Sequence, residues 1–504
     1  MGSVGKRVSS GSFLLSSGNL LATAISAIGS VLIARLLNPE EYGLIGIALI
    51  FPLMISGLAD LGFSSALVRF SSMKNSEKYL GTGFIFKLFS SFICGLIIFM
   101  LAGPFSILLA RPYIASMLRI LAIYTFSYTL FSALTCTFIG LGEYWKYALL
   151  VTIQNLLRCS ISIFMILIGF GVYGVIWAFS ISYGLSLTIA IPFLTKRAKL
   201  LGFNPSAFKE TFSYSLPLYV PILLGAPIGQ YFNMLVAWFA TNEEVGNLRV
   251  AQNLLTPISV VGAGVSTALF SNFPLLLNED YKLKDAFRKA TFYTSIIIPS
   301  ISLAIAVFST HLTLLIYGHA YTLAPTYLCL LALGGLLAPL GSYVIEPYLN
   351  SVGETKKTLR VRAFNIAVGL PLATLLVVKY GMLGFIASSL MSGLASAVYA
   401  VHMLSSKLLL RVNVKENVKP LIPPTISPVL AYTSMMTTNL FWVQAILGPI
   451  IYLALLGLTF PMFVAKRYVT ELRSFTSDLK IAGPLLSRLL KIELKMAETV
   501  QGSG

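Results

Sequence analysis

Charged residues are scarce in this sequence. Only 11% of its 504 residues are Asp, Glu, Lys or Arg, whereas 57% are apolar. An ordinary soluble domain is about 25% charged. A soluble globular fold is excluded because so few polar side chains cannot cover so large an apolar interior. Intrinsic disorder is excluded because it requires low hydrophobicity and high charge. We therefore expect a membrane protein with many spans.

The residues that build catalytic and metal sites are also scarce. The chain has four cysteines and three histidines, with no CxxC pair and no cysteine at ligand spacing from a histidine. We expect the cysteines to be packing residues rather than disulfide partners or zinc ligands. No Walker A motif is present, so no ATPase on this chain drives its work. A membrane glycosyltransferase or polymerase would need large polar loops with clustered carboxylates or histidines, which the sequence lacks. We therefore expect neither an enzyme nor a bound cofactor.

Long apolar runs dominate the sequence instead. A helix needs about 20 apolar residues to cross the hydrocarbon core of a bilayer. The first run has no charge, is longer than a signal-peptide core and lacks a small-residue cleavage site after it, so we expect a retained helix. Fourteen runs reach the required length, at 12–34, 44–68, 82–103, 117–140, 148–168, 172–194, 213–239, 248–273, 290–317, 323–349, 361–378, 382–404, 421–439 and 442–464. The predicted fold class is an all-α polytopic membrane protein with about 14 transmembrane helices.

The basic residues predict the orientation in the membrane. The net charge is +18, from 36 Lys and Arg against 18 Asp and Glu. When alternate loops are assigned to one side, starting with the N-terminus, most of the basic residues fall on that side. The opposite side holds Arg35, Arg111, Arg119, Arg249 and Lys379. The positive-inside rule then places both termini in the cytoplasm of a cell-membrane protein. The excess charge is expected to meet anionic lipid, not nucleic acid.

Three pairs of short motifs recur at nearly constant separation. Their first members are Glu40-Glu41-x-Gly43, Gly142-Glu143 with Lys146, and Gly171 with Gly174; the second members are Glu243-Glu244-x-Gly246, Gly353-Glu354 with Lys357, and Gly381 with Gly384. Each pair falls at equivalent loops of two six-helix halves. An even number of helices keeps both halves in the same orientation, so we expect parallel repeats that rock against each other.

The repeat defines the expected domains. They are an N-terminal lobe at 1–195, a cytoplasmic linker at 196–210, a C-terminal lobe at 211–405, two further helices at 420–465, and a cytoplasmic tail at 466–504. The tail alternates charges with leucines, which is typical of amphipathic helices on the inner leaflet.

Polar residues within the spans predict a cavity between the lobes. A charge at the centre of a span costs about 2.5–3.5 kcal/mol, so it normally faces protein or water. The predicted cavity residues are Arg35, Asp60, Lys87, Arg158, Asn233, Arg249, Asn253 and Glu346. Snorkelling to an interface is the alternative for the basic residues near helix ends, Lys87 and Arg249 among them. For Arg158 and Glu346 the alternative is a buried structural partner.

The seventh run contains three prolines, Pro217, Pro221 and Pro227. Proline lacks the backbone donor that a helix needs and kinks it. We expect this helix to be broken and to act as a gate, with a static kink as the alternative.

The residues at 34–43, Ala-Arg-Leu-Leu-Asn-Pro-Glu-Glu-Tyr-Gly, resemble the polysaccharide-transporter (Wzx-like) branch of the multidrug/oligosaccharidyl-lipid/polysaccharide exporter superfamily. The motif at 140–143 and its echo at 352–356 support the likeness, which covers about residues 8–465. The resemblance implies two six-helix lobes around a V-shaped cavity, plus two helices. It also implies flipping of a polyprenyl-(di)phosphate-linked oligosaccharide from the cytoplasmic to the outer leaflet by alternating access.

The resemblance sets the expected partners, and the position and charge of the polar residues set the expected site roles. The partners would be a lipid-linked oligosaccharide and membrane lipids, with the protein a monomer or associated with glycan-assembly enzymes. Arg35, Arg249, Lys87 and Arg158 would neutralise the phosphate, Arg being suited to bidentate contact. The acids would offset those cations or bind a coupling ion, Na⁺ or H⁺. Two alternatives stay open: a lipid II-type precursor flippase, and a multidrug antiporter for organic cations, which the absence of acids from the first and seventh helices disfavours.

Overall fold

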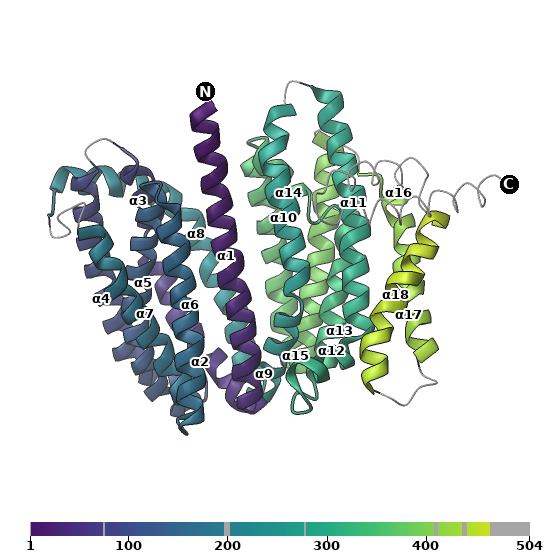
Figure 1. Cartoon of the computed structure of the whole chain (residues 1–504), viewed down its shortest axis with the longest axis horizontal. Coiled ribbons are helices and arrows are strands. Elements are labelled where there is room, and N and C mark those ends of the chain that lie inside the picture. Colours follow the sequence, from purple (N-terminus) through teal and green to yellow (C-terminus); the bar gives the residue numbers. More distant parts are fainter. Residues whose placement is uncertain are drawn as a thin grey trace. The chain divides into compact units, whose positions relative to one another are not determined.

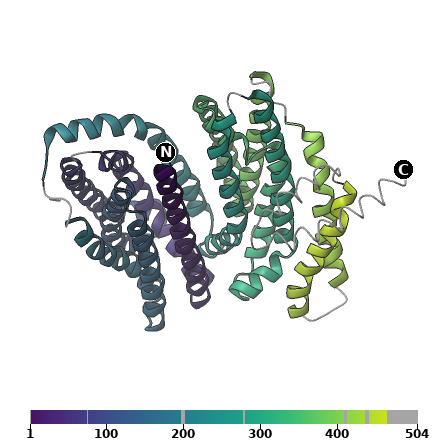
Figure 2. The same cartoon turned by 45° about the horizontal axis from the view of Figure 1, so that its top comes forward.

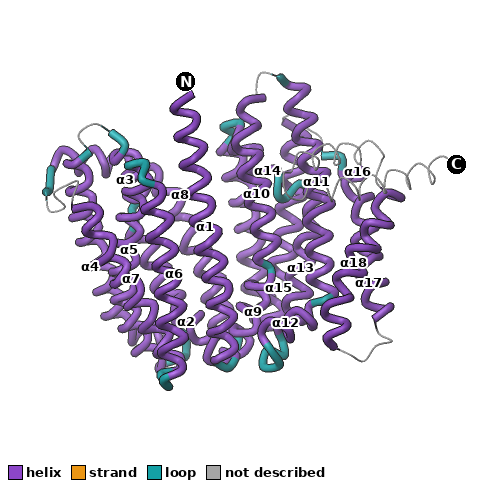
Figure 3. Tube along the Cα trace, in the orientation of Figure 1, coloured by secondary structure: helices purple, strands orange, loops and turns teal. Residues whose placement is uncertain are grey.

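The computed structural model describes residues 2–73, 76–195, 202–276, 279–407, 412–435 and 441–463. Helices joined by short loops make up this part of the chain, which contains no strand (Figure 3). The predicted all-α class is confirmed. Residues 196–201 of the predicted linker and the predicted cytoplasmic tail lie outside the described residues.

The chain folds as two compact units, residues 1–249 and 250–504. The first unit contains α1 (Gly2–Leu36), α2 (Pro39–Ala59), α3 (Phe63–Ser71), α4 (Glu77–Leu108), η1 (Pro112–Ile114), α5 (Ala115–Gly140), α6 (Tyr144–Leu167), α7 (Gly171–Thr195), α8 (Pro205–Phe239) and most of α9 (Asn242–Leu254) (Figure 1). The second contains α10 (Thr256–Asn272), η2 (Phe273–Leu276), α11 (Asp280–Val307), α12 (Ser309–Tyr317), α13 (Ala324–Ala332), η3 (Leu333–Leu340), α14 (Ile345–Ser351), α15 (Thr355–Lys407), α16 (Val414–Val418), η4 (Lys419–Leu421), α17 (Ile422–Met435) and α18 (Phe441–Phe463).

The helices of the described residues coincide with the predicted apolar runs. Eight of them are long and apolar enough to cross a membrane, or nine when the bent pair 324–340 and 345–351 counts as one span. One of the eight, α15, contains two predicted runs, 361–378 and 382–404. They meet at a kink where Gly381 has a positive φ of 56°. The chain is therefore a multi-pass membrane protein, and the number of fourteen spans stays a prediction.

Each unit has an apolar interior and an apolar outer surface. Leu130, Phe138, Leu150 and Leu187 pack between α5, α6 and α7 in the first unit. A second cluster joins α11, α14 and α15 around Phe287, Tyr348 and Leu404. Large apolar side chains also face outward, as for Met100 of α4, which is 68% exposed. Lipid tails can solvate such a surface, and the polar backbone stays bonded inside the helices.

The division into units differs from the predicted domain boundary at 196–210. The reason is that α8 packs on the first unit through its aromatic residues. Phe208 lies 6.1 Å from Phe63 of α3 and 5.7 Å from Phe86 of α4, measured between ring centroids. The hydroxyl of Tyr79 also donates to the carboxylate of Glu210. The compact unit consequently extends through α8 to Arg249.

The seventh predicted helix is continuous, contrary to expectation. We predicted a break at Pro217, Pro221 and Pro227, whereas α8 runs as one helix over Pro205–Phe239 and curves along its length (Figure 2). A proline removes one helical bond but leaves those on either side, so a helix can bend without ending. The proposed role of this helix as a gate is not tested by its shape.

Two of the repeated motifs have the same backbone in both copies. Gly142 (φ 72°) and Gly353 (φ 81°) are both left-handed, and the residue after each donates to the carbonyl five residues earlier. This is the bonding of a glycine-terminated helix end. Gly171 (φ 52°) and Gly381 (φ 56°) also match. The recurrence in the sequence is thus a recurrence of local structure.

Candidate functional site

The second predicted span is broken at Asp60, between α2 and α3. Leu61 (φ 44°) and Gly62 (φ 75°) are both left-handed, which ends α2 one turn before α3 begins. A Cβ at Gly62 would lie 2.6 Å from the Ser215 carbonyl oxygen, so the backbone of α8 passes directly against the break. Glycine is needed here for both its conformation and its size.

Side chains from three helices satisfy this break. Lys87 of α4 forms an ion pair with the Asp60 carboxylate, and Ser64 of α3 donates to the same carboxylate oxygen. The Tyr219 hydroxyl of α8 donates to the Leu58 carbonyl oxygen at 2.7 Å. Non-helical backbone inside a membrane is tolerated where protein groups bond it in this way. The break is therefore an internally bonded polar centre of the first unit.

The two members of the ion pair differ in exposure. The Lys87 side chain is 1% exposed and that of Asp60 is 27% exposed. Lys87 therefore does not snorkel to an interface, which was the alternative predicted for it. The carboxylate is the member of the pair that solvent or a ligand can reach.

Arg158 links α6 to α1. Its guanidinium donates to the Ser26 hydroxyl at 2.6 Å and to the Asn155 amide oxygen at 3.1 Å. The guanidinium carbon also lies 5.3 Å from the centre of the Phe179 ring, a cation–π distance. Arg158 therefore has structural partners, which was the alternative to a cavity role that we predicted from the sequence.

The first repeated motif begins a helix in both of its copies. Asn38 accepts from the Glu41 backbone nitrogen at 2.8 Å, and the Glu41 side chain accepts from the Asn38 nitrogen at 3.2 Å. Thr241 and Glu244 repeat this reciprocal pattern, with bonds of 3.2 and 2.8 Å. Both are capping boxes, which fix where α2 and α9 start.

The two capped helix starts lie against each other within the first unit. A Cβ at Gly43 would overlap the Asn242 carbonyl oxygen, and a Cβ at Gly246 would overlap the Pro39 carbonyl oxygen. Asn242 and Pro39 occupy equivalent positions of the motif, so the contact is reciprocal. We name this contact between 38–46 and 241–249 the repeat junction. Only glycine allows the two backbones to approach so closely.

Arg111, which we did not predict as a site residue, fixes the junction from the side. It donates to the Asn242 amide oxygen and the Ala240 carbonyl oxygen, each at 2.7 Å, and to the Ala237 carbonyl oxygen. A guanidinium at these last carbonyls completes the end of α8. The sequence signal was its presence among the few basic residues on the side opposite the termini.

The remaining predicted cavity residues lie on different helices and differ in exposure. Arg35 is exposed at the end of α1, and Asn233 is exposed and donates to Gln230. Arg249 is half-buried, with its guanidinium where a Cβ on Gly46 of α2 would stand. Asn253 belongs to the second unit. Among the predicted residues, Asp60 and Lys87 are brought into direct contact, and a cavity common to all of them stays a prediction.

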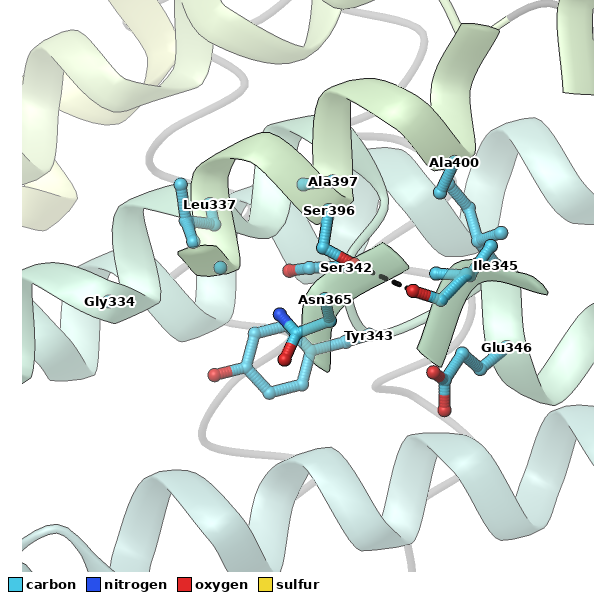
Figure 4. A pocket seen from close by; sticks show the side chains of 12 residues that line it. Gly334, Leu337, Ser342, Tyr343, Ile345, Glu346, Asn365, Ser396, Ala397 and Ala400 are labelled. Carbon is cyan, nitrogen blue, oxygen red and sulfur yellow. Dashed lines mark hydrogen bonds between the residues drawn. The ribbon is translucent and has the colours of Figure 1, made fainter. Parts of the chain in front are cut away.

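Glu346 lines a pocket inside the second unit. The pocket has a volume of about 230 Å³ and lies among η3, α14 and both halves of α15 (Figure 4). Its lining is Gly334, Leu337, Ser342, Tyr343, Ile345, Glu346, Val361, Asn365, Gly393, Ser396, Ala397 and Ala400. The Glu346 carboxylate accepts from Arg362 at 3.0 Å. In the described residues, no group of three or more His, Cys, Asp or Glu could hold a metal ion.

Comparisons with known proteins agree with this architecture. The succinoglycan biosynthesis transport protein of Rhizobium meliloti (strain 1021) is 22% identical over 337 residues, 64% of this chain and 65% of that protein. A lipid II flippase structure superposes with a TM-score of 0.70 at 19% identity, covering 88% of this chain and 98% of that one. An inward-facing multidrug resistance transporter gives 0.62 at 17% identity, covering 76% and 95%.

The two structural likenesses concern the fold, since their sequence identities are low. The family of polysaccharide biosynthesis proteins matches residues 32–324, which is more than half of the sequence and includes the repeat junction. The chain therefore belongs to the polysaccharide biosynthesis protein family, in agreement with the resemblance noted at residues 34–43.

Proposed function

We propose that this protein flips a polyprenyl-(di)phosphate-linked oligosaccharide from the cytoplasmic to the outer leaflet of the cell membrane. The observation that carries the proposal is the family match over residues 32–324. The relative from Rhizobium meliloti is named as a transport protein of polysaccharide biosynthesis. The match spans about two thirds of that relative, so its activity is extended to this chain as a proposal.

The structure supports a division of roles among the basic residues. Lys87 and Arg158 have partners inside the first unit, so we assign them to positioning. Arg35 is exposed and Arg249 half-buried, and the predicted topology puts both on the side opposite the cytoplasmic termini, to which the phosphate is delivered. We assign phosphate contact to these two arginines, whose guanidinium groups suit bidentate binding.

The repeat junction supports alternating access. It joins equivalent helix starts of the two repeats through backbone contact at Gly43 and Gly246, with the Arg249 side chain packed against Gly46. We propose that it closes the side of the membrane opposite the cytoplasmic termini while the cytoplasmic side is open, and that α8 bends as the gate.

The remaining features of the proposal follow from the sequence. The protein acts as a monomer in the cytoplasmic membrane, has no catalytic step of its own, and receives its substrate from glycan-assembly enzymes. Flipping is coupled to a Na⁺ or H⁺ gradient, with Asp60 and Glu346 as the candidate acids, 27% and 32% exposed. A flipping rate that does not respond to any imposed ion gradient would remove the coupling.

Two alternatives share the fold. The lipid II flippase and the multidrug transporter both superpose over most of the chain, and the TM-score is higher for the flippase. An organic cation would need an acid in contact with it, and Asp60 is already paired with Lys87. This pairing disfavours the antiporter.

Ligand-induced thermal stabilisation of the purified protein separates these functions. Ligands that bind only the folded state raise the melting temperature by mass action. We expect stabilisation by polyprenyl-phosphate or polyprenyl-diphosphate oligosaccharides, lost in Arg35→Ala or Arg249→Ala. Stabilisation by organic cations alone, lost in Asp60→Asn, would favour the antiporter. Stabilisation by lipid II alone would favour the precursor flippase.

A further inference from the structure

The size of the pocket in the second unit limits what can lie wholly inside it. Its volume of about 230 Å³ equals roughly eight waters at about 30 Å³ each. A single sugar ring fits such a space, whereas an oligosaccharide does not.

The pocket exists because one span is broken. The helical segments 324–340 and 345–351 meet at a bend of 51°. Gly341 is left-handed (φ 78°), and residues 341–344 leave the helix there. Ser342 and Tyr343 thereby line the pocket. Broken helices of transporters often line binding sites in this way.

The first repeat carries aromatic rings at two equivalent positions. There α5 runs unbroken over Ala115–Gly140. At the offset that relates Gly142 to Gly353, Ser342 corresponds to Phe131. At the offset that relates Gly171 to Gly381, Gly393 corresponds to Tyr183. The Phe131 and Tyr183 rings pack with centroids 5.6 Å apart. The second repeat has a hydroxyl and a glycine in place of two aromatic rings, so its pocket is a property of its sequence.

The charges of the pocket favour a neutral ligand. The Glu346 carboxylate accepts from Nε and a terminal nitrogen of Arg362, at 3.3 and 3.0 Å. A cation would have to displace this guanidinium, and an anion would meet the carboxylate. Asn365 donates to the Ser392 carbonyl oxygen at 3.2 Å, which leaves its amide oxygen as an acceptor. Hydroxyl groups of a neutral ligand satisfy these acceptors.

We propose that this pocket binds one neutral hexopyranose ring of the transported glycan. Glu346 and Asn365 accept hydroxyl hydrogens, and Ser342 exchanges a further hydrogen bond. The ring of Tyr343 lies beside Asn365 and offers an apolar face to the sugar's C–H groups (Figure 4). The inference deepens the proposed function and rests on it, because it assigns part of the glycan to the second unit.

The test measures binding of simple sugars to the purified full-length protein. The probes are methyl glucoside, methyl galactoside and the methyl glycoside of N-acetylglucosamine, with tetramethylammonium and inorganic phosphate as charged comparisons. We expect at least one glycoside to bind with a Kd on the order of 1 mM, without competition from either ion. Failure of all three glycosides to bind, or displacement by an ion, overturns the proposal.

Two kinds of variant tie binding to this pocket. Gly393→Tyr and Ser342→Phe install the rings that the first repeat carries, and each is expected to weaken glycoside binding more than about tenfold. Gly184→Ala is the control, because a Cβ there has no neighbour within 4 Å. Asn365→Leu leaves the pocket volume nearly unchanged and covers the case in which a bulky variant does not fold. Variants that fold and bind glycoside as the wild type does overturn the proposal.

Flipping by Gly393→Tyr separates this inference from the proposed function. We expect a higher KM for the lipid-linked oligosaccharide with little change in kcat. If the wild type flips the substrate and Gly393→Tyr does so with the same KM and kcat, the proposal of a sugar-binding pocket is wrong. The proposed flippase function is then unaffected. No flipping by the wild type overturns the flippase, and the pocket's role in transport with it, even when glycosides bind.

Discussion

The unequal exposure of Asp60 and Lys87 decides what each substitution does. Removing one member of a buried ion pair leaves the other charge uncompensated, which costs about 3–5 kcal/mol. The Lys87 side chain is 1% exposed, so its ammonium has no access to water, whereas the Asp60 carboxylate is 27% exposed and can be hydrated. The aspartate should therefore be the more sensitive position.

We expect Asp60→Asn to lower the free energy of unfolding in detergent by about 3–5 kcal/mol and Lys87→Met to lower it less, with the melting temperatures in the same order. The double variant should recover part of the loss, because it leaves no unpaired charge. Lys379→Met, at an exposed position, is the control. Equal losses of unfolding free energy in the two single variants, with no recovery in the double variant, would contradict an ion pair between Asp60 and Lys87.

Arg111 gives a second prediction for a single residue. Arg111→Lys keeps the positive charge but loses the fork that reaches Asn242 and two carbonyl oxygens of the α8 end. Hydrogen bonds from a charged donor contribute about 1.5–3 kcal/mol each, so we expect a loss of about 2 kcal/mol in thermal or denaturant unfolding. Arg119→Lys, with an exposed side chain, should change stability little. Similar stabilities for both variants would show that Arg111 does not hold the junction.

At the scale of elements, the repeat junction depends on two glycines. A Cβ at either Gly43 or Gly246 overlaps a backbone oxygen, which cannot rotate away. Overpacking of this kind costs about 1–3 kcal/mol. Gly103 and Gly184 also lie within helices but have no neighbour within 4 Å of an added Cβ.

We predict that Gly43→Ala and Gly246→Ala each slow flipping by about tenfold or more, consistent with about 1.4 kcal/mol or more in the closing step. Gly103→Ala and Gly184→Ala should flip at the wild-type rate. Initial rates in vesicles with matched protein amounts provide the comparison. Wild-type rates in both junction variants would exclude the junction from the transport cycle.

The positions of the helices could be predicted from the sequence better than the positions of the breaks within them. Hydrophobic length located the helices, because a span must cover the bilayer whatever its neighbours are. The breaks at Leu61 and near Gly341, and the continuity of α8 through three prolines, depend on which side chains satisfy the backbone. Tyr219, which bonds the carbonyl of Leu58, is more than 150 residues distant in the chain. No local pattern records such a partner.

Some residues of the candidate site could be predicted from the sequence, but their contacts could not, because the partners are distant in the chain. Charge within a span identified Asp60 and Lys87 separately, and their pairing appeared in the structure. Arg111 stood at a helix end, where basic residues are common, so its bonds to Asn242 were not foreseen. The short motif with Glu40, Glu41 and Gly43 indicated a repeat but not the contact between its two copies.

At the scale of the whole molecule, the two units differ in the polar features that they contain. The first unit contains the bonded break at Asp60 and the repeat junction, whereas the second contains a neutral pocket where the first repeat packs two rings. The phosphate is assigned to arginines and the sugar to the pocket.

The most direct test is flipping by the purified protein in sealed vesicles. The vesicles carry a polyprenyl-diphosphate oligosaccharide, and an added lectin reports the fraction in the outer leaflet. We predict that the lectin-accessible fraction rises with the wild-type protein and rises much more slowly with Gly43→Ala. Vesicles with the wild type that match protein-free vesicles, yet accumulate an organic cation, would contradict the account.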